Sequence, residues 1–152
     1  SWLEPDPQPF MLSMPVDGVL GLGYYDNDLV DHQGGYWTAH NGIDFLADIG
    51  TEVYAAFSGT VLSVVLNDTH IGATIKIQHK DGFVTTYKML DSSDVAVTVG
   101  QKVSTGDVIG CIGEIPEATE GVAGSKLHFE LTKDGVYINP IIYFQESDKL
   151  KN

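Results

Sequence analysis

The chain has 152 residues and a formal net charge of −13, from 8 lysines against 21 aspartates and glutamates. Its length fits one domain with a sizeable core. Nucleic acid and anionic lipid are not expected partners, because the chain has no arginine and few cations to neutralise phosphates. The excess of carboxylates is expected mainly to keep the domain soluble.

The chain has no apolar run long enough to cross a bilayer. The longest runs, such as residues 61–66, are far shorter than a membrane span, so we expect no direct membrane insertion of this sequence. Cys111 is the single cysteine, which excludes an internal disulfide and a multi-cysteine metal site. Its apolar neighbours predict a buried strand residue rather than a reactive thiol.

In chain order, the sequence predicts a lead-in, one β-rich domain and a tail. Pro5, Pro7 and Pro9 predict an extended lead-in over residues 1–9. One domain is expected over residues 10–145, followed by a polar tail over 146–152. Short apolar or alternating runs separated by Gly, Asp and Asn predict an all-β domain with little helix. The expected strands are 43–47, 52–56, 60–66, 74–79, 83–90, 108–112 and 127–133.

Two kinds of connection stand out between these strands. Asp81 and Gly82 predict a hairpin turn, because both residues tolerate the positive φ angles of a two-residue turn. The glycines that bracket residues 100–107 predict another tight connection. Residues 114–125 carry a proline, glycines and glutamates and predict an exposed loop of functional length.

Two clusters of residues could bind a metal ion. His40 and Asp44 are four residues apart, so an extended strand would place both on one face, where they could share a metal. In the second cluster, His128 alternates with apolar neighbours and is a candidate third ligand. Two histidines and one carboxylate with a fourth position open to water is the arrangement of catalytic zinc. These spacings leave open that either histidine is a hydrogen-bonded structural residue.

Several motifs in order resemble the lysostaphin/LytM-like peptidoglycan-endopeptidase family. They fall between about residues 36 and 143, and the set is more specific than any single motif. The resemblance implies a twisted, largely antiparallel sheet with a groove formed by loops. The matching segments are 40–44, 50–56, 59–61, 86–87, 99–103, 106, 109–110, 127–130 and 139–140.

The resemblance also assigns site residues. The family's zinc ligands fall on His40, Asp44 and His128, and all three are the expected residue types. The family places a catalytic histidine two residues after the tyrosine of the middle strand and another two residues before the last zinc ligand. Those positions hold Met89 and Lys126 here. Met89 cannot transfer a proton, and a lysine cation is a poor base at neutral pH.

This departure implies a LytM-like domain that binds zinc but is non-catalytic, acting as an interaction module in the cell envelope or in sporulation. One alternative is an active zinc metalloendopeptidase that cleaves peptidoglycan cross-link peptides, with Lys126 stabilising the oxyanion. Another is a plain wall-binding domain. Lys126 also leaves open whether zinc binds. Its ammonium could replace zinc by pairing with Asp44, or its long aliphatic stem could place the ammonium in solvent.

Residues 28–45, which include Tyr36 and Trp37, resemble clostridial sporulation members of this family. That likeness implies an extracytoplasmic location, with the full-length protein membrane-anchored or secreted. It also implies a protein partner in the cell envelope, with a peptidoglycan peptide as the alternative. The aromatic side chains here are expected to pack in the core, although they could line a groove. The remaining histidines, His32, His70 and His79, are expected to be structural or surface residues.

Overall fold

A computed structural model gives the fold for residues 8–21, 23, 25–32, 36–66, 72–114 and 125–144, and for 25–32 and 36–40 it describes the backbone alone. The strands are β1 (Val19–Leu20), β2 (Tyr25–His32), β3 (Tyr36–His40), β4 (Ile43–Leu46), β5 (Glu52–Tyr54), β6 (Gly59–Val65), β7 (Ala73–Gln78), β8 (Phe83–Leu90), β9 (Lys102–Val103), β10 (Val108–Cys111), β11 (Lys126–Lys133) and β12 (Val136–Ile138). Two 3-10 turns, η1 (Lys80–Gly82) and η3 (Pro140–Tyr143), supply the helical residues of the described part.

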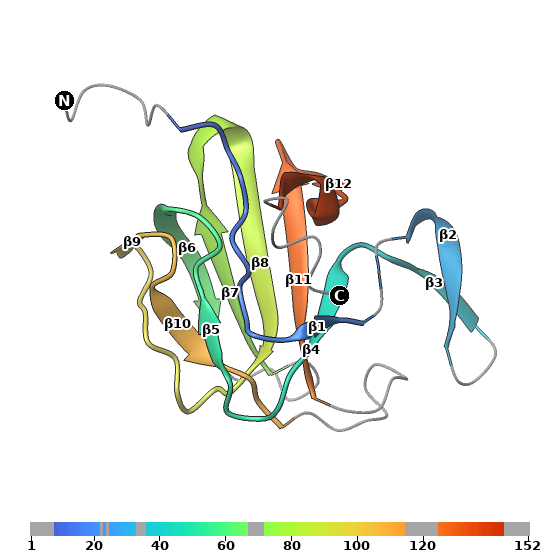
Figure 1. Cartoon of the computed structure of the whole chain (residues 1–152), viewed down its shortest axis with the longest axis horizontal. Coiled ribbons are helices and arrows are strands. Elements are labelled where there is room, and N and C mark those ends of the chain that lie inside the picture. The colour runs from blue at the N-terminus through green and yellow to red at the C-terminus, as the bar shows by residue number, and fades with distance from the viewer. Residues whose placement is uncertain are drawn as a thin grey trace.

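One antiparallel sheet forms the body of the molecule (Figure 1). Its strands follow the order β1-β4-β11-β8-β7-β6-β9, and β12 pairs with the end of β11. β5 and β10 form a separate antiparallel pair, and β2 and β3 form a two-stranded ribbon that projects beside β4. The all-β, largely antiparallel fold expected from the sequence is confirmed. Within the described residues, no helix is long and apolar enough to cross a membrane.

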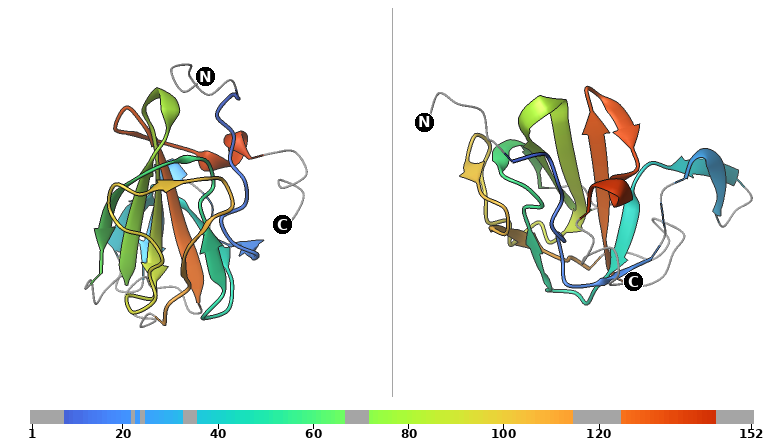
Figure 2. Two further views of the ribbon diagram at one scale, coloured as in Figure 1. Left: turned by 90° about the vertical axis from the view of Figure 1, so that its left-hand side faces the viewer. Right: turned by 45° about the horizontal axis from the view of Figure 1, so that its top comes forward.

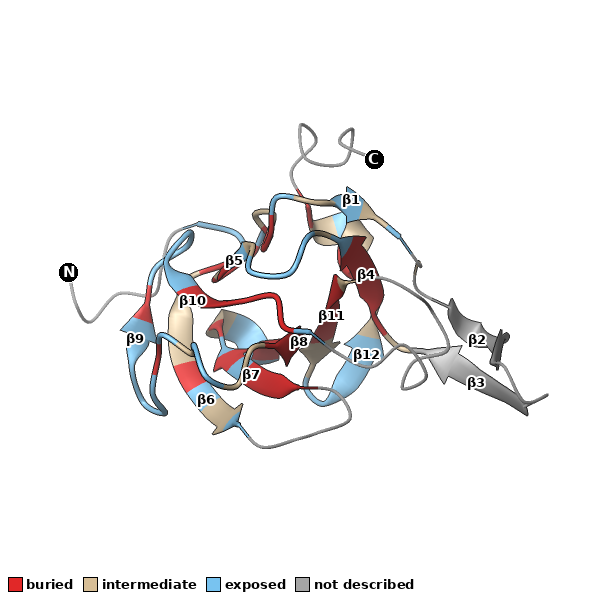
Figure 3. Cartoon of the chain, turned by 90° about the horizontal axis from the view of Figure 1, so that it is seen from below, coloured by how far each residue is buried: buried red, intermediate tan, exposed pale blue. Residues whose placement is uncertain are grey.

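The core lies on one face of this sheet. Alternate residues of the central strands are fully buried there, including Ile75, Tyr87 and Phe129. The N-terminal segment and the β5–β10 pair cover that face. A backbone hydrogen bond joins the two, since the Tyr54 N–H donates to the Pro15 carbonyl at 2.7 Å. Figure 2 shows the N-terminal segment running along the sheet, and Figure 3 shows buried residues concentrated in β4, β11, β8 and β7.

The expected strands are all present, with ends that differ by up to two residues. The range 83–90 matches β8 at both ends. The sequence analysis missed β1, β2, β3, β9 and β12, which are short or rich in polar residues. The predicted loop at 114–125 lies outside the described residues except for its first and last positions, as do residues 1–7 of the lead-in and the polar tail.

The Asp-Gly turn is confirmed. Asp81 and Gly82 have φ angles of 58° and 79°, and the Phe83 N–H donates to the Lys80 carbonyl. The sequence analysis missed a second turn of this kind, in which Asp134 and Gly135 have φ angles of 50° and 83° and join β11 to β12. Both pairs adopt the left-handed conformation that hairpin turns of two residues require.

A buried polar chain crosses the core beneath β8. Nδ1 of His79 lies 2.8 Å from the Ser58 carbonyl, and Nε2 lies 2.7 Å from the Thr85 hydroxyl. The Thr85 and Tyr87 hydroxyls are 2.8 Å apart, and the Ala56 N–H donates to the Tyr87 oxygen at 3.0 Å. A carbonyl can only accept, so a neutral His79 ring donates through Nδ1 and accepts through Nε2. His79 is therefore a structural residue, as expected.

This chain predicts a pH dependence of stability. Burial lowers the pKa of His79, and its bond to the Ser58 carbonyl only partly opposes that shift. Below pH 6.5 the imidazole of His79 therefore binds a proton more readily in the unfolded chain than in the folded chain. The stabilisation from neutral His79 is present above pH 6.5 and is lost as the pH falls below it. Urea unfolding of wild type and His79→Gln should show a steeper fall for wild type between pH 7 and about pH 5. Parallel pH profiles would contradict a neutral buried His79.

Candidate functional site

The site lies on the face of the sheet opposite the core, around the central strand β11. β11 runs between β4 and β8, and His128 faces Asp44 on one side and Lys88 on the other. Because strand side chains alternate, the neighbours Leu127 and Phe129 point into the core while His128 points away from it. This alternation was predicted from the sequence, and the structure confirms it.

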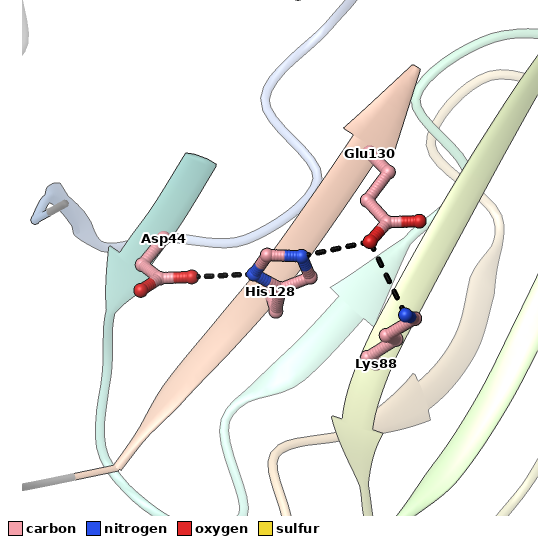
Figure 4. A network of polar contacts seen from close by, with 4 residues as sticks. All are labelled: Asp44, Lys88, His128 and Glu130. Atoms are coloured by element: carbon pink, nitrogen blue, oxygen red, sulfur yellow. Dashed lines mark hydrogen bonds and ion pairs between the residues drawn. The ribbon is translucent and has the colours of Figure 1, made fainter. Parts of the chain in front are cut away.

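Four side chains form a continuous polar line across β4, β11 and β8 (Figure 4). Nδ1 of His128 lies 2.8 Å from Oδ1 of Asp44, and Nε2 lies 2.9 Å from Oε2 of Glu130. The same Glu130 oxygen lies 3.2 Å from Nζ of Lys88. Asp44, His128 and Glu130 are all buried. Buried charges need such partners, because an unpaired charge away from water is costly.

The charges in this line fix its protonation. Burial lowers the pKa of His128, but the hydrogen bonds and charges of Asp44 and Glu130 outweigh it and raise the pKa to about 9. Burial raises the pKa of Glu130, but its bond to His128 and the Lys88 ammonium outweigh that effect and lower it. Without a metal, the imidazole is thus a cation between two carboxylates, and each ring nitrogen donates one hydrogen bond.

A zinc ion fits the geometry of Asp44 and His128. Zn–O and Zn–N bonds of about 2.0–2.2 Å in a tetrahedral site separate two ligand atoms by roughly 3.3 Å. Oδ1 of Asp44 and Nδ1 of His128 are 2.8 Å apart, so a shift of about half an ångström would admit the ion in place of the shared proton. Such an ion would act as a Lewis acid and acidify a bound water. Among the described side chains alone, no group of three metal-binding residues gathers.

His40 reaches the same region by its backbone. It is the last residue of β3, and its side chain lies outside the described part of the chain. The expectation that His40 and Asp44 share one continuous strand is wrong, since β3 ends at His40 and β4 begins at Ile43. Between them, a Cβ on Gly42 would lie 2.5 Å from the Phe129 carbonyl oxygen and 3.0 Å from Nε2 of His128. Only glycine lets this corner approach the site so closely.

The two positions that replace the family's histidines are both buried. Lys126 is 4 % exposed, so the hypothesis that its stem carries it into solvent is wrong. In the described part of the chain, Lys126 forms no ion pair with Asp44, whose carboxylate contacts His128 instead. Replacement of zinc by a Lys126–Asp44 pair is therefore not supported by this arrangement.

Met89 lies in a β-bulge. The cross-strand pairs are Ala73 with Leu90 and Ile75 with Tyr87, so Lys88 and Met89 together lie opposite Thr74 alone. Met89 has a φ of 73°, and it is buried without belonging to the main core cluster. Bulges of this kind turn a side chain away from its expected face and are common beside active sites.

The sequence analysis missed two members of this site and the bulge beside them. Lys88 and Glu130 were not assigned a role, although a carboxylate two residues from a candidate ligand on one strand face is a usable signal. The bulge at Met89 could not be predicted from the sequence, because no residue type in this segment indicates a bulge. The aromatic residues ahead of His40 are in the part whose side chains are not described, and His70 lies outside the described residues.

Comparisons with known proteins agree with this fold. The model of Peptidase family M23 matches residues 38–140. Stage II sporulation protein Q of Bacillus subtilis (strain 168) is 34% identical over 112 residues, which are 72% of this chain and 38% of that protein. The chain thus spans well under half the length of that relative.

Solved structures give the same result. A structure titled as the SpoIIQ-SpoIIIAH pore forming complex superposes with a TM-score of 0.75 and 29% identity over 91% of this chain and 94% of that chain. A zinc containing peptidase from Vibrio cholerae superposes with a TM-score of 0.71 and 29% identity over 87% of this chain and 39% of that chain. The expected resemblance to LytM-like proteins and to stage II sporulation protein Q is confirmed. The chain belongs to Peptidase family M23.

Proposed function

We propose that this chain is a non-catalytic member of its family, a zinc-binding interaction module of the cell envelope. The observation that carries the proposal is the contact of Asp44 with His128 at 2.8 Å, beside family positions for catalytic histidines that hold Met89 and Lys126. This contact supports Asp44 and His128 as two of the proposed ligands, and the residue types at positions 89 and 126 support the absence of the groups that would move protons. His40 completes the ligand set by its position in the family motif.

The missing groups bear directly on chemistry. A positioned general acid or base contributes about 10² to 10⁴-fold to a rate. The Met89 thioether has no proton to give or take at neutral pH, and Lys126 is a cation in place of an imidazole. Zinc alone polarises a carbonyl and acidifies water, but the proton must still reach the leaving amine. We infer that two such losses leave hydrolysis negligible.

A protein partner is the binding role that the comparisons favour. Stage II sporulation protein Q is similar to this chain over 72% of this chain, and SpoIIQ was solved in a complex with SpoIIIAH. We propose a protein partner in the cell envelope for this chain, with the domain outside the cell membrane and anchored or secreted by the full-length protein. A peptidoglycan peptide remains the competing ligand for the same face.

A second candidate is an active metalloendopeptidase that cleaves peptidoglycan cross-link peptides. The likeness to a zinc containing peptidase favours it. In that case Lys126, which is buried on β11 two residues before His128, would supply a cation that stabilises the oxyanion. The two candidates differ in whether the wild-type chain turns over any substrate.

Zinc binding tests the proposed ligand set. Wild-type protein freed of chelator should bind about one equivalent, because Asp44 and His128 are in contact and the family motif assigns His40 as the third ligand. Asp44→Asn and His128→Ala should weaken zinc binding by at least about 10-fold, measured by elemental analysis and competition with a chelator. Asp48→Asn is the matched control, since Asp48 is exposed. A wild type without zinc that gains it in Lys126→Ala would instead mean that the lysine occupies the site.

Turnover of substrate tests the non-catalytic assignment. Wild type supplied with zinc should not cleave peptidoglycan or glycine-rich peptides. The double variant Met89→His, Lys126→His should gain turnover of about 10²-fold or more over that background, because it restores both proton-transfer groups. The backbone favours this change, since histidine is enriched among residues with the positive φ found at Met89. Wild-type turnover that His40→Ala abolishes would overturn the non-catalytic assignment.

A further inference from the structure

Glu130 lies outside the proposed zinc set, yet its carboxylate contacts the ring of one of the proposed ligands. Oε2 of Glu130 lies 2.9 Å from Nε2 of His128, and both side chains are buried. Nδ1, on the other edge of the ring, faces Asp44 at 2.8 Å. The two carboxylates thus hold the imidazole from opposite edges (Figure 4).

We propose that Glu130 is a positioning residue for the metal: it accepts the Nε2–H of His128 and so fixes the ring orientation and the tautomer in which Nδ1 binds zinc. This inference rests on the proposed zinc site. A ligand histidine whose second nitrogen donates to a carboxylate is a more basic ligand and is held in one rotamer, and loss of such a partner costs about 10 to 100-fold in metal affinity.

Glu130 is not itself a fourth ligand in this geometry. Nδ1 and Nε2 lie on opposite edges of one imidazole ring, so an ion bound at Nδ1 lies away from the Glu130 oxygen that contacts Nε2. Asp44 is therefore the carboxylate that would bind the ion, and Glu130 the carboxylate that orients the ring. The same residue type has two roles, which differ by the nitrogen that each oxygen contacts.

Lys88 keeps Glu130 in the form that this role requires. Its ammonium lies 3.2 Å from the same Oε2 atom, which favours the ionised carboxylate. An ionised carboxylate only accepts hydrogen bonds, so Nε2 keeps its proton against Glu130, and Nδ1 is the ring nitrogen that would give up its proton to bind an ion beside Asp44. Lys88 reaches this oxygen because it stands opposite His128 on β8, at the start of the bulge.

Gly42 holds the contact from the remaining side. A Cβ at position 42 would lie 3.0 Å from both Cγ of Glu130 and Nε2 of His128. The absence of that Cβ lets the corner between β3 and β4 close over the hydrogen bond without pushing it apart. His128, Glu130 and Gly42 together leave the imidazole little freedom to rotate.

The test compares zinc affinity in three proteins, wild type, Glu130→Gln and Glu130→Met, by competition with a chelator. The Gln amide keeps an oxygen that can accept from Nε2–H, whereas Met keeps the bulk and removes the acceptor. We expect zinc binding to weaken in the order wild type, Gln, Met, with a loss of about 10 to 100-fold for Met. Glu52→Gln is the matched control, because Glu52 is exposed in β5. Thermal unfolding identifies a variant that fails to fold, and the Gln variant then carries the comparison.

A second measurement is independent of zinc. Long-range ¹H–¹⁵N spectra of the metal-free protein should show an Nε2 proton of His128 protected from exchange in wild type and lost in Glu130→Met. Equal zinc affinity and equal ring signals in all three proteins would overturn the proposal. If zinc binding survives Asp44→Asn and His128→Ala, the proposed zinc set fails, and the Nε2 proton still decides the role of Glu130.

Discussion

The His128 imidazole, held between the carboxylates of Asp44 and Glu130, is the interaction on which the site depends. The contact with Asp44 joins β11 to β4, the contact with Glu130 lies within β11, and the ring is buried between the two carboxylates. Removing one member of a buried ionic group leaves an uncompensated charge, which commonly costs about 3–5 kcal/mol. Loss of one of the four side chains would therefore destabilise the others, and the geometry of any metal site here depends on all of them.

The position of β11 makes this arrangement possible. It lies between β4 and β8, so one strand pairs with both neighbours and its two faces belong to different environments. Leu127 and Phe129 pack into the core, where Phe129 meets the ring of Tyr87 at 5.3 Å between centroids. His128 and Glu130, which alternate with them, belong to the polar line. Packing on one face thus fixes the orientation of the polar side chains on the other, because the strand alternates with a period of two.

The bulge on β8 contains two residues of this region, Lys88 and Met89. It places two residues, Lys88 and Met89, opposite the single residue Thr74, and it gives Met89 a left-handed backbone. Lys88 joins the polar line through Glu130. Met89 brings an apolar side chain to a position where the family resemblance places a histidine. The bulge therefore gives its two residues different surroundings, since Lys88 contacts Glu130 and Met89 is buried.

The sequence by itself determined the all-β class, the main strands, the turn at Asp81 and Gly82, and the family. It did so because the alternation of apolar and polar residues, the turn residues and the spaced motifs are local properties that can be read without the fold. It also placed Asp44 and His128 in one site, through the order of the motifs. Only the tertiary structure decided that the two side chains meet across neighbouring strands, that Lys126 is buried, and that Glu130 and Lys88 complete the line. Those facts depend on strand order, register and the bulge, which arise from pairings between different segments of the chain. The contact of Asp44 with His128, for example, joins residues with a separation of 84.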